Sequence, residues 1–361
     1  MKKILINAMM LRKQNTGLGV YACEVLSLLL PELIKTYDIT LLCESKESLE
    51  ERLDISAIRC IEIKKSSAVA RELAVARFIY PNARTYDLVY SMSQHGFPCL
   101  KTNTIITVHD IMPRLYPKRR FHQYLYYILY LPLILKRAQF VITGSINTQK
   151  DLSKYYSCKR VTVAPSGIRF SKGQMLAVQW SGSRKKQYII IGVHYPYKNI
   201  HSVIDIFISN SKFVDRELII IGNADNSYGR QLKRQVKKGK AENRIFFTEY
   251  ISEAEKEKYL SDAYALIYPT KYEGFGLPVL EGMVHGIPVA CSNTSSLPEV
   301  VGDAAIMFDP ENLDDMAAKI LMLDDEAYSK QLIKKGYENI KRFTWQNCAE
   351  KVLDVIENVL K

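Results

Sequence analysis

The 361-residue sequence lacks the features that mark secreted, membrane-spanning or zinc-binding proteins. Its seven cysteines are scattered, odd in number and without a C-x-x-C pair, which argues against a disulfide framework or a zinc site and favours a cytoplasmic protein with reduced thiols. The longest nearly uncharged apolar run, Tyr124 to Leu135, is too short to span a bilayer and contains Pro132. The opening MKKILINAMM has no signal-peptide cleavage site, so we expect a first strand there.

The chain is long enough for two domains, because a single hydrophobic core rarely extends beyond about 250–300 residues. Its net charge of +12 favours an anionic partner, which could be membrane lipid, nucleic acid or a phosphate-bearing substrate. No recognised nucleic-acid-binding module accompanies this charge, so we do not expect a nucleic-acid partner.

The most informative stretch, residues 263–286, predicts a strand, a tight glycine loop and a helix. Gly274 and Gly276 form the loop, and Pro278 lies where the first turn of a helix favours proline. Unpaired amides and the helix dipole at such a start attract a phosphate. Glu273 and Glu281 frame the start, and carboxylates beside a phosphate fit hydroxyl groups on either side of it. This combination predicts a nucleotide sugar as ligand.

The spacing of Glu273 and Glu281, with Gly-Phe-Gly-Leu-Pro directly after the first glutamate, resembles the signature of the retaining glycosyltransferases of family four. The sequence from Ile287 to Asn312 is also similar to that family. The resemblance implies the GT-B fold, with Glu273 at the donor sugar and Glu281 at the ribose. It also implies that the loop amides hold the donor diphosphate, and the donor-binding residues there are Gly274, Phe275, Gly276 and Leu277.

The same resemblance assigns two further donor contacts. Family members have a lysine after the first strand of the second domain that pairs with the diphosphate, and Lys198 matches it. Tyr197 and Val193 stand where many relatives have arginine, so one or two cations of that site are missing or are supplied from elsewhere. In the family, backbone groups of a later turn contact the nucleobase, and this turn corresponds to Tyr250 and Ile251 here.

Strand and helix patterns alternate along the whole chain, which predicts an α/β protein with parallel sheets covered on both faces. Together with the resemblance, this gives two Rossmann-like domains facing across a cleft. We expect an acceptor-side domain at 1–167 completed by a C-terminal helix at 346–361, a linker at 168–186 and a donor domain at 187–345.

Two positions in the first domain are candidates for the site. Gly17 to Ala22 fits the dinucleotide fingerprint G-x-G-x-x-A, so an NAD-dependent oxidoreductase remains an alternative, although about eight residues separate the glycines from their strand. In the family, Gly17 and Gly19 would back onto the donor diphosphate. His109, in the pattern V-H-D at a strand end, would contact the donor sugar, whereas a loop histidine bonded to Asp110 is the structural alternative.

Residues 111–150 contain no acidic side chain, and basic residues between 114 and 137 bracket the run HQYLYYILYLPLIL. Such a segment can lie on an anionic membrane surface, which would place the protein on the inner face of the cell membrane. The alternative is a helix that packs into its own domain, because four aliphatic side chains also fit a core stripe: Leu125, Ile128, Leu129 and Leu133.

These observations predict transfer of a sugar from a nucleoside diphosphate to a hydroxyl of a glycan or lipid-linked acceptor, with retention of configuration, in polysaccharide assembly. Glu273, His109 and Lys198 are the expected catalytic residues. No D-x-D pair lies near the glycines, so we expect no metal and no cofactor. Same-face attack is favoured over double displacement through Glu273. A noncatalytic protein that binds membranes through its basic segment is the second alternative.

Overall fold

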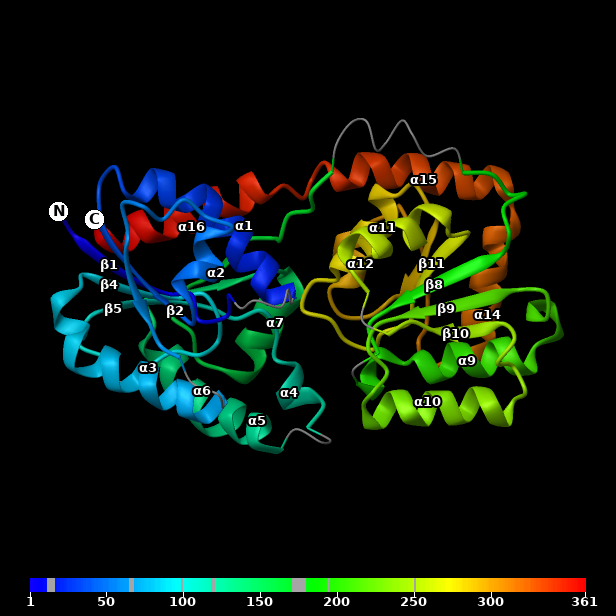
Figure 1. The fold of residues 1–361 in the computed structure, drawn as a ribbon, viewed down its shortest axis with the longest axis horizontal. Helices are drawn as coiled ribbons and strands as arrows, with labels where there is room; N and C mark the ends of the chain where they lie inside the picture. Colours follow the sequence, from blue (N-terminus) through cyan, green and yellow to red (C-terminus); the bar gives the residue numbers. More distant parts are fainter. Residues whose placement is uncertain are drawn as a thin grey trace. The chain divides into compact units, whose positions relative to one another are not determined.

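A computed structural model describes residues 1–11, 17–64, 68–98, 100–117, 121–170, 180–193, 195–249 and 251–361. The chain forms two compact units, which consist of residues 1–167 with 344–361 and of residues 168–343 (Figure 1). The predicted linker, 168–186, groups with the second unit where it is described, and the backbone N–H of Ile168 bonds the carbonyl of Phe343 at 3.0 Å. The last helix belongs to the first unit.

The first unit is built on a sheet of seven parallel strands in the order β3-β2-β1-β4-β5-β6-β7. Its strands are nearly continuous apolar runs, as expected where helices cover both faces of a sheet. They are β1 (Lys3–Asn7), β2 (Asp38–Cys43), β3 (Arg59–Glu62), β4 (Leu88–Ser91), β5 (Asn103–Thr107), β6 (Phe140–Thr143) and β7 (Val161–Val163).

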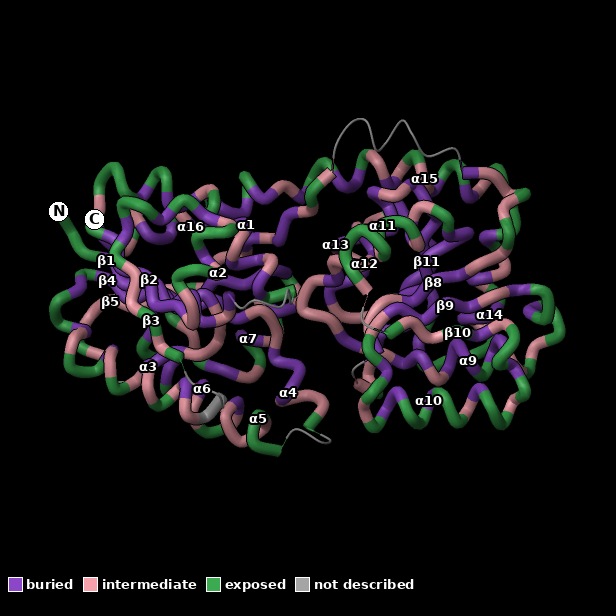
Figure 2. Tube along the Cα trace, in the orientation of Figure 1, coloured by how far each residue is buried: buried purple, intermediate pink, exposed green. Residues whose placement is uncertain are grey.

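Helices α1 and α16 pack side by side on the first unit (Figure 1). Their buried faces, with Tyr21 from α1 and Trp345 from α16, share one core with the strands (Figure 2). The helices of this unit are α1 (Gly17–Leu33), α2 (Lys46–Glu50), α3 (Ala68–Asn82), α4 (Met112–Leu115), α5 (Phe121–Leu125), the π-helical turn η2 (Tyr126–Tyr130), α6 (Leu131–Arg137), α7 (Ile146–Tyr155) and α16 (Trp345–Leu360), with a 3₁₀ turn η1 (Ala83–Thr85).

The continuous segment α5-η2-α6 carries the Tyr-rich run and buries a different stripe from the predicted one. Leu129 and Leu133, expected in the alternative core stripe, are 64% and 54% exposed. The side chains that face the core are instead Tyr127, Leu131, Ile134 and Leu135. The π-helical turn adds a residue to one turn of the helix, and this shifts the positions that face inward relative to a regular helical period.

The second unit has a six-stranded parallel sheet in the order β10-β9-β8-β11-β12-β13. Its strands are β8 (Gln187–Ile191), β9 (Glu217–Ile221), β10 (Ile245–Phe247), β11 (Ala265–Tyr268), β12 (Val289–Ser292) and β13 (Ile306–Phe308). The chain runs outward in one direction from β8 and in the other from β11. These neighbouring strands therefore mark the topological switch point, where open α/β sheets bind ligands beyond the carboxyl ends of their strands.

Helices cover both faces of this second sheet (Figure 1). Helix α9 contacts α10 and α14, and α12 contacts α15. The helices are α9 (Ile200–Ser209), α10 (Ser227–Lys238), α11 (Glu253–Asp262), α12 (Leu277–Val284), α13 (Leu297–Val301), α14 (Leu313–Leu321) and α15 (Glu326–Ile340), with 3₁₀ turns η3 (Pro196–Lys198), η4 (Ser211–Phe213) and η5 (Met322–Asp324). The predicted strand and helix on either side of the glycine loop are confirmed as β11 and α12.

Candidate functional site

The loops after β8 and β11 bring together Lys198 and Glu273, which are 75 residues apart in the sequence. The ammonium of Lys198 lies 2.6 Å from Oε1 of Glu273 and donates a second hydrogen bond to the hydroxyl of Tyr268 at 3.0 Å. The two charged side chains are only 16% and 15% exposed. An ammonium has three N–H donors, so one remains after the two acceptors found among the described residues.

The loop that carries Lys198 is tied to the loop of Glu273 by main-chain contacts. The carbonyl of Tyr197 accepts a hydrogen bond from the backbone N–H of Lys271 at 2.8 Å. Asn199 adopts a left-handed conformation and is fully buried, and its side-chain amide donates to the carbonyl of Pro310 at 2.8 Å. These contacts fix the stem of Lys198 between two ordered residues.

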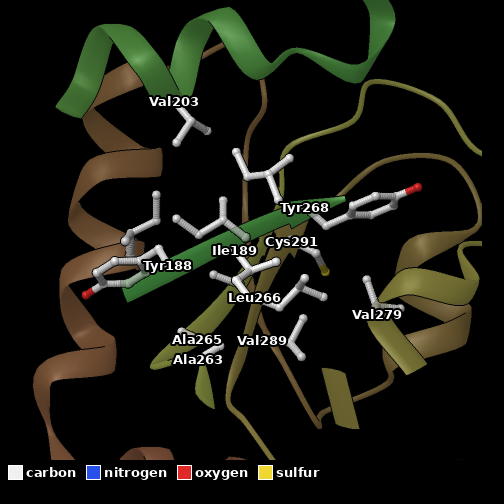
Figure 3. Close-up of a cluster of buried hydrophobic side chains, with 14 of the residues drawn as sticks. Tyr188, Ile189, Val203, Ala263, Ala265, Leu266, Tyr268, Val279, Val289 and Cys291 are labelled. Atoms are coloured by element: carbon white, nitrogen blue, oxygen red, sulfur yellow. The ribbon is translucent and has the colours of Figure 1, made fainter. Parts of the chain in front are cut away.

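Tyr268 is the last residue of β11 and lies where the hydrophobic core meets the site. Figure 3 shows its hydroxyl and that of Tyr188 at opposite ends of the buried cluster. Burial, followed by the nearby Glu273 charge, raises the pKa of Tyr268 well above its usual value, so the phenol stays protonated. Tyr188 instead accepts a hydrogen bond from Arg216, which pairs with Asp324 at 2.6 Å. The two ends of the sheet therefore hold two separate ion pairs.

The glycine loop ends at Gly276, the residue that caps α12, with φ of 107° and ψ of 47°. A side chain is strained in this region, and a Cβ at this position would lie 2.6 Å from the side chain of Leu297. The left-handed backbone favours glycine here, and the end of the Leu297 side chain would have to shift to admit a Cβ. Pro278 lies in the first turn of the helix, where its missing N–H costs no hydrogen bond.

The carbonyl groups of the loop are held by the start of α13. The hydroxyl of Ser296 donates to the carbonyls of Glu273 and Phe275 at 3.0 and 2.8 Å, and Ser295 accepts from the N–H of Glu273 at 2.9 Å. In a trans peptide the carbonyl and the following N–H point in opposite directions. The N–H groups of Gly274 and Gly276 therefore point away from Ser296.

Glu281, in the second turn of α12, forms the second ion pair of the region. Its Oε1 lies 3.0 Å from the ammonium of Lys256 in α11, and these side chains are 21% and 18% exposed. Lys256 also pairs with Glu253 at 2.8 Å. Burial lowers the pKa of Lys256, but the two carboxylates outweigh it, so the pKa lies above its usual value and the ammonium stays charged.

His109 lies in the first unit, beyond the carboxyl end of β5. Its Nε2 lies 3.0 Å from the carbonyl of Met92, and its ring packs edge-on against Tyr21 of α1 with centroids 4.7 Å apart. A carbonyl can only accept, so Nε2 carries the proton and Nδ1 is an acceptor. Burial lowers the pKa of His109 to about 4, which keeps the ring neutral near pH 7. Oδ1 of Asp110, the neighbour in the structural alternative, accepts a hydrogen bond from the backbone N–H of Met112 at 2.8 Å.

The predicted glycines of the first unit are the first and third residues of α1. Gly17 is exposed, and a Cβ there would meet nothing within 4 Å, whereas Gly19 is buried. The fold of the described residues therefore does not itself favour glycine at position 17, in contrast to position 276. A bound group that approaches the backbone closely would require it.

The remaining predicted positions lie on the second unit. Ile251 is partly buried and packs against its core, and Tyr250 lies outside the described residues. Val193, where many relatives have arginine, is fully buried. The described cysteines are free thiols, and Cys99 is not among them. No cluster of His, Cys, Asp and Glu side chains suited to a metal ion occurs in the described ranges.

Sequence reasoning missed three contributors to the site. Tyr268 occupies an apolar position of a buried strand, so only its place at the carboxyl end of that strand distinguishes it. Lys256 belongs to the charged sequence of α11, where nothing in the pattern indicates contact with α12. Ser296 directly precedes α13, and its two bonds to the glycine loop depend on tertiary structure, so no local pattern indicates them.

Comparison with known proteins gives a family match and relatives that cover most of the chain. Residues 177–339 match the family model described as glycosyl transferases group 1. The chain is 26% identical over 303 residues to O-antigen chain mannosyltransferase B of Escherichia coli, which covers 77% of this chain and 78% of that protein. It is 24% identical over 362 residues to O-antigen chain mannosyltransferase RfbU of Salmonella typhimurium, covering 96% and 99%.

Solved structures resemble the whole fold. A sucrose-phosphate synthase from Thermosynechococcus elongatus superposes with a TM-score of 0.76 at 16% identity and covers 100% of this chain and 99% of its own. HepE from Anabaena, in complex with UDP and glucose, superposes with a TM-score of 0.75 at 16% identity and covers 99% and 100%. These likenesses concern the fold, which is the GT-B arrangement predicted from the sequence.

Proposed function

Since residues 177–339 match the glycosyl transferases group 1 and the chain has a GT-B fold, we propose that it transfers mannose from a nucleoside diphosphate to a surface glycan. The acceptor would be a hydroxyl of a glycan or lipid-linked saccharide in O-antigen assembly. The printed activities of the two O-antigen mannosyltransferases support the sugar and the pathway. The dinucleotide alternative at α1 and the noncatalytic alternative have no support in the family match.

One observation carries the proposal: the Lys198–Glu273 pair lies beside a helix start whose loop N–H groups point away from Ser296. The loop 274–277 and the third N–H of Lys198 would hold the donor diphosphate. Ile251 and Tyr250 would contact the base, and Glu281 the ribose. Glu273 would accept hydrogen bonds from sugar hydroxyls. On the first unit, the neutral His109 would also accept from a sugar hydroxyl, and Gly17 and Gly19 would let a phosphate approach the start of α1.

The reaction proposed breaks the bond between C1 of the sugar and the oxygen of the β-phosphate. The electron pair leaves with the diphosphate, where Lys198 and the loop N–H groups would stabilise the developing negative charge without a metal. The acceptor oxygen then bonds C1 from the same face and passes its proton to the departing phosphate, so the configuration is retained. Glu273 is bound to an ammonium at 2.6 Å, which disfavours its use as a nucleophile in a double displacement.

A donor panel tests this assignment. We expect one or more mannose nucleotides to raise the melting temperature and to be hydrolysed slowly without acceptor, whereas NAD has no effect. Glu273→Gln should abolish the hydrolysis, while Glu311→Gln should not, because Glu311 is a 68% exposed carboxylate that pairs with Lys271. Stabilisation by NAD instead of a nucleotide sugar would restore the oxidoreductase alternative.

An anionic membrane surface is the second proposed partner, through the α5-η2-α6 face. Phe121, Leu129 and Leu133 are 63%, 64% and 54% exposed there. Lys136 and Arg137 are exposed at its end, and residues 118–120 lie outside the described ranges. Large apolar side chains beside cations fit the interface of an anionic bilayer. No described helix has the length and apolar content needed to cross a membrane.

Cosedimentation with vesicles tests this surface. We expect binding to vesicles rich in phosphatidylglycerol, little binding to phosphatidylcholine, and loss of binding at high salt. Leu129→Ser with Leu133→Ser should weaken binding about tenfold. Leu73→Ser is the matched control, because Leu73 is 56% exposed on α3 of the same unit. Equal losses in both variants would exclude α5-η2-α6 as the membrane face.

A further inference from the structure

The ion pair between Lys256 and Glu281 joins α11 to α12. Glu281 belongs to the sequence signature of the site, whereas Lys256 does not. Both side chains are about four-fifths buried, with exposed fractions of 18% and 21%. The other partner of Lys256, Glu253, is 67% exposed and lies on the same helix three residues away. The contact with Glu281 is therefore the shielded one of the two.

A shielded pair of this kind restricts the carboxylate. Glu281 has a long side chain with several rotamers, and the ammonium holds its Oε1 at 3.0 Å from a residue on a neighbouring helix. A carboxylate oxygen can accept more than one hydrogen bond, and Oε2 is not the atom that Lys256 holds. The group is therefore held in one orientation while acceptor capacity remains for hydroxyl donors.

We propose that Lys256 is a positioning residue that holds Glu281 in the orientation that accepts the ribose hydroxyls of the donor nucleotide. The inference rests on the proposed function, because it takes the donor to be a ribonucleoside diphosphate. Lys256 acts through Glu281 and need not touch the donor. A role confined to joining α11 to α12 is the competing explanation.

Removal of the ammonium should have two effects on a bound nucleotide. The carboxylate regains rotamer freedom, so its bonds to the ribose form at an entropic cost. Its charge also loses the adjacent cation and repels the diphosphate more strongly. Only the regained rotamer freedom of Glu281 affects binding through the ribose hydroxyls. A nucleotide without those hydroxyls therefore distinguishes a positioning role of Lys256 from a purely electrostatic or structural one.

The experiment compares the binding of GDP and UDP with that of their 2′,3′-dideoxy analogues, using the full chain. We expect the wild type to prefer its ribonucleotide about 30-fold, since hydrogen bonds to a charged group are strong. Lys256→Met should lower this preference to about threefold, and Lys256→Gln is a second variant that retains a polar side chain if the first folds poorly. Lys258→Met, on the exposed face of α11, is the matched control and should keep the full preference.

The ratio of the two affinities decides the matter. If Lys256→Met weakens the ribonucleotide and the dideoxy analogue by the same factor, Lys256 does not position Glu281 and the proposal is overturned. If the wild type binds nucleotide but does not distinguish the two forms, the ribose role of Glu281 fails and the proposal fails with it. If the wild type binds neither nucleotide, the proposed function itself is wrong.

Discussion

Replacement of Lys198 by methionine separates stability from catalysis at the centre of the site. The change keeps most of the apolar stem and removes the cation from Glu273 and from the hydroxyl of Tyr268. Loss of one partner of a buried ion pair costs about 3–5 kcal/mol. The two side chains retain 16% and 15% exposure, and water screens part of the remaining charge, so we expect a loss of about 2 kcal/mol.

The second variant adds Glu273→Gln to Lys198→Met. Since the unpaired carboxylate is then gone, we expect the melting temperature, lowered by about 5 °C in Lys198→Met, to recover by at least half. Mannose transfer should not recover, because the cation proposed for the diphosphate is still missing. It should stay about 100-fold below the wild type in both variants. Calorimetry and a transfer assay with the best donor of the panel measure the two quantities.

A double variant that regains both stability and transfer would refute this reasoning, because Lys198 would then only neutralise Glu273. The matched control is Lys271→Met, which breaks a pair in the same loop whose side chains are 25% and 68% exposed. A pair this open to water should contribute at most about 1 kcal/mol, and transfer should be unchanged.

Three further results are expected. Gly276→Ala should cost about 2–3 kcal/mol, because it strains a backbone at φ 107° and places a Cβ 2.6 Å from Leu297, whereas Gly17→Ala should leave stability unchanged. Burial lowers the pKa of His109 to about 4, from an ordinary value of 6.5. As the pH falls below 6.5, the unfolded state therefore binds a proton that the folded state does not. The free energy of unfolding should then fall by up to about 1.4 kcal/mol per pH unit between pH 6.5 and 4. Urea titrations of His109→Gln should show a weaker fall. EDTA should leave transfer intact, and a loss restored by Mg²⁺ or Mn²⁺ would contradict metal independence.

Long, strongly patterned elements of the fold could be predicted from the sequence. A glycine pair followed by an extended apolar pattern predicts a helix at Gly17 to Leu33, and α1 is found there. Short elements such as α2 and α7 were not assigned, because five to ten residues span too few turns for a clear period. The inward face of α5-η2-α6 could not be predicted, because a π-helical turn shifts the face and leaves no signature in the pattern.

Some residues of the site could likewise be predicted from the sequence, whereas others could not. The glycine loop and Glu273 could be assigned from a local motif because strand, loop and helix are contiguous. The partners of the two glutamates could not, since Lys198 lies 75 residues and Lys256 25 residues from the carboxylates that they contact. Contacts between residues this far apart in the sequence depend on which strands and helices become neighbours in the fold. A single sequence does not show this arrangement directly.

If the site binds a diphosphate as proposed, the two ion pairs also explain how two carboxylates can lie beside it. Lys198 offsets the charge of Glu273, and Lys256 that of Glu281, so these four side chains carry no net formal charge, while the second partner of Lys256, Glu253, is 67% exposed and screened by water. The sign of the local potential then depends on the partial positive charge at the start of α12 and on the loop N–H groups. Removal of either lysine would leave a net negative charge beside those groups and oppose the diphosphate. We therefore expect the lysines to be as necessary to donor binding as the glycines, although only the glycines belong to the motif.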